Sequence, residues 1–365
     1  MKLNCTTEKI KNAISITERV TGKNLTLPIL SSILLIASGK SLKIRATNLS
    51  IGVEVEIPAT IEKEGVAAVS GDILNNLFTN INTNQEINIS LENDNLLIQT
   101  KNNKIILKNF SPDDFPTIPI VKGESITIPS NKFIDGIKSV YYASAISDIK
   151  PEIGSIYIYQ ENDNLVFVAT DSFRLAEKKI KIKNIENFPA ILIPFKNIVE
   201  ILRIFSDIND DIKICFSKNQ ISFSSKNIYF TSRVIDGIFP DYKQIIPKNH
   251  TTEIIILKQD LLNSLKMSNV FSDKFNQITF QIQPKEKLFE LKSKNNDIGE
   301  NTTKLDASLS GVSIVANFNQ KYLLDCIQSI KEDSIVLQMV GDNKPLVVSG
   351  LSNQSFMYLI MPMNR

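Results

Sequence analysis

The sequence predicts an α+β protein built from three similar units, and three observations support this prediction. An amphipathic helical stripe occurs three times at nearly constant spacing, a short alternating strand follows each stripe, and each unit opens with a strand that leads into another helix. Two helices beside several short, hairpin-like strands favour antiparallel sheet. A period near 124 residues indicates a repeated domain rather than a solenoid repeat.

The repeated stripe has the i, i+3, i+4, i+7 spacing of one face of an amphipathic helix. Its first residues, Leu74, Ile198 and Leu323, lie 124 and 125 residues apart. We therefore predict a helix over each stripe. The complete stripes are Leu74, Leu77, Phe78 and Ile81, then Ile198, Ile201, Leu202 and Phe205, and then Leu323, Cys326, Ile327 and Ile330.

Strands flank these helices in each unit. Polar and apolar residues alternate over residues 86–89 and 211–214, the pattern of a half-buried strand, and we expect a strand at the matching residues 334–337. The helix that opens each unit has a small residue inside its apolar stripe, which lets the helix lie close to another element. These small residues are Ala13, Gly136 and Ser264. The repeat predicts three domains, at residues 1–122, 123–248 and 249–365.

Composition limits the function classes. Hydrophobic residues make up 42% of the chain, enough to build cores, and the formal charge of +2 does not favour capture of nucleic acid by overall charge. The sparse cysteines Cys5, Cys215 and Cys326 are typical of reduced thiols. The N-terminus has no apolar signal core, and the run Ile29–Ala37 is shorter than the about 20 residues that span a bilayer. We expect a soluble, cytoplasmic protein.

Residue patterns do not favour an enzyme. The single histidine, His250, lies in a polar linker without a second metal ligand or an evident nucleophile. Gly39-Lys40-Ser41 resembles the end of a phosphate-binding loop, but Leu34 stands where the first glycine is required. Asp113 and Asp114 lie on a Pro-flanked turn, where solvated carboxylates are usual. No catalytic residue, metal or cofactor is predicted.

The stretch Leu165–Ala176 is the first candidate for a binding site. It begins as a strand, breaks at Thr170-Asp171-Ser172 and resumes with Phe173-Arg174-Leu175. An aromatic, a cation and a leucine at one turn suit a pocket for a partner. By itself the pattern also fits an ordinary hairpin with an exposed arginine.

Two further stretches, Phe239–Tyr242 and the C-terminal Tyr358–Arg365, combine with Leu165–Ala176, Leu27–Leu30 and the threefold repeat. Together they resemble the β sliding clamps of bacterial replicative DNA polymerase III, over the whole chain. The resemblance implies three clamp domains per chain, with two helices each on antiparallel sheet. It also implies that two chains join head to tail in a six-domain ring whose helices surround duplex DNA.

The resemblance implies a non-catalytic processivity subunit with no cofactor and no membrane partner. It would tether the replicative polymerase, the clamp loader and repair proteins through short peptides that bind one pocket. The pocket residues carried over from the family are Ile153, Thr170, Ser172, Phe173, Arg174, Leu175, Pro240, Gln244, Ile245, Asn343, Pro345, Leu359, Ile360, Met361, Pro362 and Met363. Their apolar members suit Leu and Phe anchors, and their methionines suit varied ligands.

The same resemblance implies a DNA-facing set and a dimer interface. The DNA-facing candidates are Lys23, Lys138, Lys150, Lys196 and Arg203, and the interface candidates are Ile105, Val270 and Phe271. The chain departs from the family at the pocket turn, where Ser172-Phe173 replaces a common Gly-His. It also has Asn24, Asp72 and Glu152 where other members place residues that contact DNA.

A second hypothesis remains open on the sequence alone. The helix faces that carry basic residues also carry acids such as Asp72, Glu200 and Asp325. A mixed face of this kind is compatible with a three-domain scaffold that binds peptides and does not encircle DNA.

Overall fold

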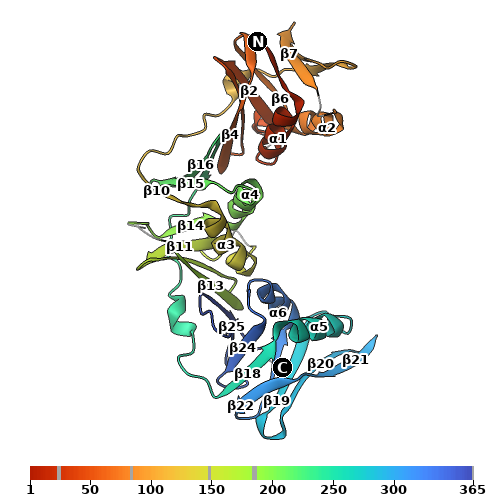
Figure 1. Cartoon of the computed structure of the whole chain (residues 1–365), viewed down its shortest axis with the longest axis vertical. Helices are drawn as coiled ribbons and strands as arrows, with labels where there is room; N and C mark the ends of the chain where they lie inside the picture. Colours follow the sequence, from red (N-terminus) through yellow and green to blue (C-terminus); the bar gives the residue numbers. More distant parts are fainter. Residues whose placement is uncertain (23–25, 83–84, 147–148, 183–186, 364–365) are drawn as a thin grey trace. The chain divides into compact units, whose positions relative to one another are not determined.

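Figure 1 shows the computed structural model of the chain, which describes residues 1–22, 26–82, 85–146, 149–182 and 187–363. Two compact units form, one from residues 1–131 and 199–234 and the other from residues 132–198 and 235–365. The second sequence repeat therefore contributes to both units. We call them unit 1 and unit 2 and describe each by itself.

The predicted helices form, and their stripes are buried. Leu77 is the exception, because it is only half-buried. The helix over the third stripe ends at Ile327, before the stripe does. Ile330 is buried in the following turn, where its backbone N–H donates to the carbonyl of Ile327 at 3.3 Å. The helices are α1 (Thr7–Glu18), α2 (Gly71–Asn80), α3 (Ser130–Val140), α4 (Phe195–Phe205), α5 (Lys258–Asn269) and α6 (Gln320–Ile327).

The small residue in α3 permits a close approach to the sheet. A Cβ atom at Gly136 would lie 2.3 Å from the ring of Phe167, which is fully buried. The same ring packs edge-on against Phe133 at 5.6 Å between centroids. The prediction that this helix lies close to another element is confirmed.

Unit 1 contains two antiparallel sheets, with α1 and α2 packed side by side (Figure 1). In the larger sheet β17 pairs with β4 and places Phe230 opposite Val53, so strands of the first and second repeats share one sheet. The smaller sheet has the order β5 (Thr60–Lys63), β1 (Lys2–Thr6), β7 (Glu86–Glu92), β8 (Asn95–Gln99) and β9 (Lys104–Lys108). The larger has the order β10 (Glu124–Pro129), β15 (Asp211–Phe216), β16 (Gln220–Ser225), β17 (Ile228–Arg233), β4 (Ile51–Pro58), β3 (Ser41–Thr47), β2 (Ser32–Ser38) and β6 (Gly65–Ser70).

Unit 2 repeats this plan, with α5 and α6 packed together (Figure 1). Here β13 pairs with β26 and joins the second repeat to the third. The larger sheet has the order β14 (Ile191–Pro194), β11 (Ser155–Glu161), β12 (Asn164–Thr170), β13 (Arg174–Lys181), β26 (Phe356–Ile360), β25 (Leu346–Gly350), β24 (Ser334–Met339), β18 (Thr252–Leu257) and β22 (Ala307–Gly311). The smaller has the order β21 (Gly299–Lys304), β20 (Leu288–Asn295), β19 (Gln277–Gln283) and β23 (Ile314–Asn319).

The nine-stranded sheet of unit 2 has two distinct faces, because side chains alternate along each strand. One face packs toward α6: Tyr358 on this face lies 6.0 Å from the ring of Tyr142, and Arg174 stacks on Tyr322. The segment that connects β17 to β18 packs on the other face through Phe239 and Tyr242. We call these the helix face and the linker face.

Candidate functional site

A tight turn lies between β12 and β13, at the centre of the predicted pocket. The carboxylate Oδ1 of Asp171 accepts the backbone N–H groups of Phe173 and Arg174, each at 3.0 Å. Thr170 Oγ1 donates to the carbonyl of Arg174 at 2.7 Å and accepts the N–H of Ser172 at 3.2 Å. Ser172 has φ +78°, a left-handed conformation that this side-chain network holds in place.

The apolar floor of the predicted pocket, which we call the hollow, lies on the linker face and is buried. Leu175 on β13 is paired directly with Leu359 on β26, so their side chains lie side by side. Both belong to one buried cluster with residues of β12, β14 and the linker. The other buried members of that cluster are Val166, Val168, Leu192, Phe239 and Tyr242.

The linker segment is anchored to this face by a buried polar network. The Tyr242 hydroxyl donates to the Glu177 carboxylate, and the hydroxyls of Tyr242 and Tyr159 lie 2.8 Å apart. Burial raises the pKa of Tyr242, and its hydrogen bonds with Glu177 and Tyr159 raise it further. The phenol therefore stays protonated and remains a donor. This fixes Gln244 and Ile245, which lie in the same short 3₁₀ turn and are exposed beside the hollow.

The C-terminal tail closes another side of the pocket. The backbone N–H of Met361 donates to the carbonyl of Phe173 at 2.8 Å, and that of Met363 donates to the carbonyl of Asn317 at 2.8 Å. Pro362 lies between these two anchors. The backbone of Phe173 is thus held on both sides, while its side chain is 63% exposed. The turn and the tail together present a rigid, partly apolar rim.

Arg174 and Ile360 lie on the opposite side of the sheet from the hollow. They are paired with each other, one residue away from the pair Leu175–Leu359, and therefore share the helix face. The guanidinium of Arg174 is bonded to Asp171 at 2.9 Å and to Asp325 at 2.6 Å. Burial opposes its charge, but Tyr358, Asp325 and Asp171 together raise the pKa of Arg174. Arg174 therefore ties the turn to α6.

The remaining predicted pocket residues lie around the turn. The backbone N–H of Ala145 donates to the carbonyls of both Ile153 and Thr170, at 3.1 and 3.2 Å, which places Ile153 beside the end of β12. Asn343 and Pro345 precede β25, whose first residue Leu346 is paired with Ile360. Pro240 lies between Phe239 and the 3₁₀ turn, and its carbonyl accepts the N–H of Tyr242 at 2.7 Å.

The predicted DNA-facing residues are found in different surroundings. Lys138 on α3, Lys196 on α4 and Lys150 are exposed. Arg203 is exposed but donates to Glu200 at 2.7 Å, so its charge is partly neutralised. Lys23 lies outside the described residues.

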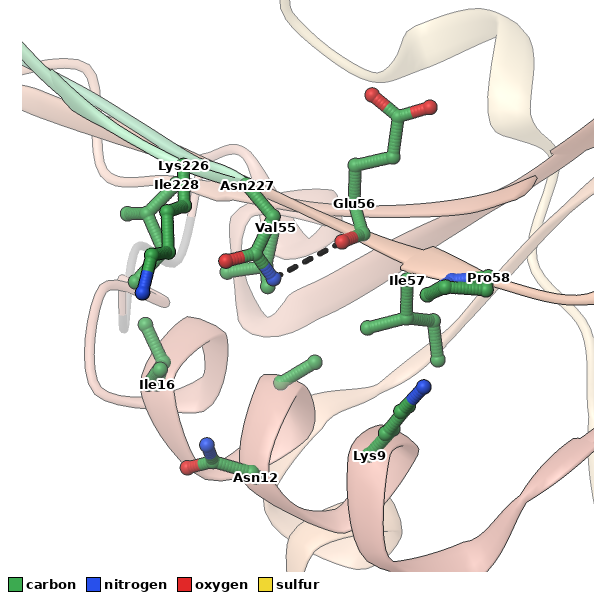
Figure 2. A pocket seen from close by; sticks show the side chains of 11 residues that line it. Lys9, Asn12, Ile16, Val55, Glu56, Ile57, Pro58, Lys226, Asn227 and Ile228 are labelled. Atoms are coloured by element: carbon green, nitrogen blue, oxygen red, sulfur yellow. Dashed lines mark hydrogen bonds between the residues drawn. The ribbon is translucent and has the colours of Figure 1, made fainter.

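Unit 1 also holds a basic pocket of about 370 Å³ between α1, β4 and β17 (Figure 2). Lys9 and Asn12 line it from α1, and Lys226 and Asn227 line it from the turn before β17. Asn227 donates from Nδ2 to the carbonyl of Glu56 at 2.9 Å, while the Glu56 carboxylate points away from the pocket (Figure 2). Lys226 is paired with an aspartate at 2.6 Å. No sequence pattern points to Lys226, because its place in the pocket depends on the pairing of β17 with β4.

The predicted dimer contacts lie on the edge strand β9 in unit 1 and just after α5 in unit 2. In unit 1, β9 is the edge of its sheet, with Ile105 half-buried and Ile106 63% exposed. In unit 2, β21 is the edge of its sheet. Val270 is exposed just after α5, and Phe271 lies 3.6 Å from where a Cβ of Gly299 would be. The sequence prediction omitted three exposed apolar side chains, namely Ile106 on β9, Ile298 just before β21 and Phe275 in the turn before β19.

The described residues contain no group of three or more His, Cys, Asp and Glu side chains arranged to hold a metal ion. None of the described helices combines the length and the apolar character required to cross a membrane. Repeated α+β domains, with two helices on antiparallel sheet in each, are the architecture that the sequence resemblance implied for the sliding-clamp class.

Models of the N-terminal, central and C-terminal domains of the DNA polymerase III beta subunit match residues 1–119, 127–241 and 243–364, and the chain belongs to this family. The family is a non-catalytic processivity subunit. The chain is 26% identical over 348 residues to the beta sliding clamp of Staphylococcus aureus, covering 92% of each chain.

Solved structures have the same fold. A DNA polymerase sliding clamp from Bacillus subtilis superposes with a TM-score of 0.95 at 23% identity, over 100% of this chain and 99% of that chain. A sliding clamp from Pseudomonas aeruginosa bound to griselimycin superposes with a TM-score of 0.94 at 23% identity, over the whole of both chains.

Proposed function

We propose that this chain is the DNA sliding clamp of its cell. Two copies close head to tail into a ring around duplex DNA, and the ring tethers the replicative polymerase and other proteins in the cytoplasm. We assign the three clamp domains to residues 1–122, 123–248 and 249–365. The observation that carries the proposal is the match of all three family domains along the chain. A peptide-binding scaffold that does not encircle DNA is not favoured, because the family is that of sliding clamps.

The proposed partner site is the pocket around Leu175 and Leu359. Leu and Phe side chains of a short peptide would gain roughly 1.5–3 kcal/mol each on burial there. With backbone hydrogen bonds, such a peptide would reach about micromolar affinity. One shared pocket would let the polymerase, the clamp loader and repair proteins compete for the same clamp.

The proposed DNA contacts are weak and independent of sequence. A ring that slides requires phosphate contacts without base readout. The exposed side chains Lys138, Lys150 and Lys196 suit this role, and Arg203 suits it less because Glu200 holds it. Lys9 in the basic pocket of unit 1 is a further candidate.

The decisive experiment compares circular with linear DNA. The protein is loaded by a clamp loader onto a nicked circular plasmid, the loader is removed, and half of the sample is linearised. A topological ring stays on the circle and is lost from the free ends of the linear DNA. Equal loss from both would reject the clamp. The same preparation should have a mass in solution of about 82 kDa, twice the 41.0 kDa of one chain.

A further inference from the structure

A second hollow lies on the linker face of unit 2, directly beside the proposed pocket. It has a volume of about 480 Å³ and extends over β13, β26, β25, β24 and β18. Residues 246 and 247 of the linker form one wall, and Leu351 and Gln354 of the loop between β25 and β26 form another. We call it the sheet groove.

The pairing register places the sheet groove on the same face of the sheet as Leu175 and Leu359 of the proposed pocket. Leu359 is paired with Val347 on β25, Val347 with Gln338 on β24, and Gln338 with Glu253 on β18. Paired residues share one face of the sheet, and neighbouring strands lie about 4.8 Å apart. The row that begins at the pocket with Leu175 and Leu359 therefore runs straight across the floor of the groove and ends at a carboxylate.

The neighbouring row supplies the rest of the floor. Glu177 is paired with Met357, Met357 with Ser349, and Ser349 with Val336. The floor of the groove thus carries the apolar side chains of Met357, Val347 and Val336, with the polar Ser349 and Gln338 among them. Its two ends carry the carboxylates of Glu177 and Glu253.

The charged residues that line the groove are all acidic. Its lining includes two glutamates and no lysine, arginine or histidine. Glu177 is already engaged by the hydroxyl of Tyr242 and lies 3.6 Å from Lys179. Glu253 accepts a hydrogen bond from Gln338 at 2.8 Å, has His250 at 3.4 Å, and remains 28% exposed. Glu253 is therefore the carboxylate that an incoming cation can reach.

We propose that the sheet groove binds the chain segment that flanks the clamp-binding peptide of a partner protein, and selects an apolar residue followed by a lysine or arginine. This inference rests on the proposed peptide pocket. From Leu359 to Glu253 the row crosses three strand spacings, about 14 Å, which an extended segment covers in about four residues. In the bound peptide, the apolar residue lies about two residues beyond the last anchor that occupies the pocket, over Val347 and Val336. The lysine or arginine lies about four residues beyond that anchor, beside Glu253.

The test uses the full chain and three kinds of peptide probe, with affinities measured by fluorescence anisotropy. The core probe carries Leu and Phe anchors only. The extended probe adds Gly-Leu-Gly-Lys, placed at either end in separate peptides, and the control probe replaces the lysine by glutamate. One extended probe should bind about tenfold more tightly than the core, and its glutamate counterpart should lose most of this gain.

Two variants assign the gain to the sheet groove. Glu253→Gln should remove the preference for lysine over glutamate, and Ser349→Lys should remove the gain altogether by placing a cation in the groove. Neither residue is in the pocket, so the core affinity should stay within twofold. Glu286→Gln, at an exposed carboxylate outside the groove, is the matched control and should retain the full gain.

The outcomes separate the two proposals. If the core probe binds and neither extension improves its affinity, the sheet groove inference is wrong and the pocket stands. If the gain persists in Ser349→Lys, the extension binds elsewhere and the inference is also wrong. If the core probe itself does not bind, the proposed pocket fails and the inference fails with it.

Discussion

Arg174 Nη1 donates to Asp325 Oδ2 at 2.6 Å, although 151 residues separate the two in the chain. The contact joins the start of β13 to α6, and so joins the second sequence repeat to the third. The same guanidinium lies 4.2 Å above the ring of Tyr322 and bonds Asp171 at 2.9 Å. The turn that shapes the pocket is therefore held by a cation on the other face of the sheet.

Replacement of Arg174 should destabilise unit 2 and weaken peptide binding together. Arg174→Met leaves Asp171 and Asp325 without their cation. Breaking a buried ion pair costs about 3–5 kcal/mol, and we expect about 2–3 kcal/mol here because Asp325 is 43% exposed. Urea unfolding measures the stability, and anisotropy of the core probe measures binding.

Two further variants identify the cause of this effect. Asp325→Asn should lower the stability by less than Arg174→Met does. In the double variant the two losses of stability should not add, which shows coupling between the two sites. Arg174→Lys keeps the charge, but a lysine cannot bond both carboxylates in the planar geometry of a guanidinium. Its stability should therefore lie between that of Arg174→Met and that of the wild type. A loss of peptide binding in Arg174→Met with unchanged stability would contradict the structural role and would indicate direct contact with the peptide.

Removal of the tail should affect binding more than stability. Deletion of residues 361–365 removes the backbone hydrogen bonds of Met361 and Met363, worth about 0.5–1.5 kcal/mol each. It also removes one side of the pocket rim. Affinity for the core probe should fall at least tenfold, while the mass in solution is unchanged.

A shorter deletion supplies the control. Deletion of residues 364–365, which lie outside the described residues, keeps both tail hydrogen bonds and should retain the affinity of the wild type. Full binding by the longer deletion would show that the tail takes no part in the pocket.

The sequence predicted the fold well because repeated apolar spacing reports burial directly. The stripes that begin at Leu74, Ile198 and Leu323 are periodic in themselves, and burial of such stripes decides the helices. The sequence could not predict that Arg174 and Leu175 lie on opposite faces of the sheet. Adjacent strand residues face opposite ways, and which way each faces depends on the register with β26, a strand about 180 residues distant. The role of Lys226 and the sheet groove were missed for the same reason. The surroundings of both depend on strand pairing between repeats.

Lys178 should make stability depend on pH above neutrality. It is 5% exposed on the helix face and donates to Ser355 at 2.9 Å. Burial lowers its pKa, Asp135 opposes this effect, and Lys331 adds to it. Because the folded pKa lies below the unfolded value, the unfolded chain holds this proton more tightly. Stability should therefore rise with pH between the folded pKa and the unfolded value of about 10.5.

Substitution isolates the effect of Lys178. Lys178→Met removes the buried charge and should be at least as stable as the wild type at pH 7, with an advantage that shrinks toward pH 10. Lys294→Met, at an exposed lysine, should change stability by less than about 0.5 kcal/mol at both pH values. Urea unfolding at pH 7 and pH 10 measures the stability of each variant relative to the wild type. A constant loss of stability in Lys178→Met would show that its packing and its hydrogen bond outweigh its charge.

Exposed apolar residues on β9 and after α5 should hold the ring together. Ile106 is exposed on the edge strand β9, and Phe275 is exposed after α5. Burial of one such side chain contributes about 1.5–3 kcal/mol, and a closed dimer contains each contact twice. Ile106→Asp and Phe275→Asp should therefore each give a 41.0 kDa monomer in light scattering. Ile120→Asp, at an exposed isoleucine outside the strands, should remain a dimer.

A mixture of the Ile106→Asp and Phe275→Asp chains tests the head-to-tail arrangement itself. The Ile106→Asp chain keeps its intact Phe275 surface, and the Phe275→Asp chain keeps its intact Ile106 surface. If Ile106 of one chain meets Phe275 of the other, the mixture forms one intact interface and gives an open dimer of about 82 kDa, twice the 41.0 kDa chain, although neither variant dimerises alone. If like surfaces met instead, one of the variants would dimerise by itself. Such an open dimer should also fail to stay on circular DNA, because one interface is missing.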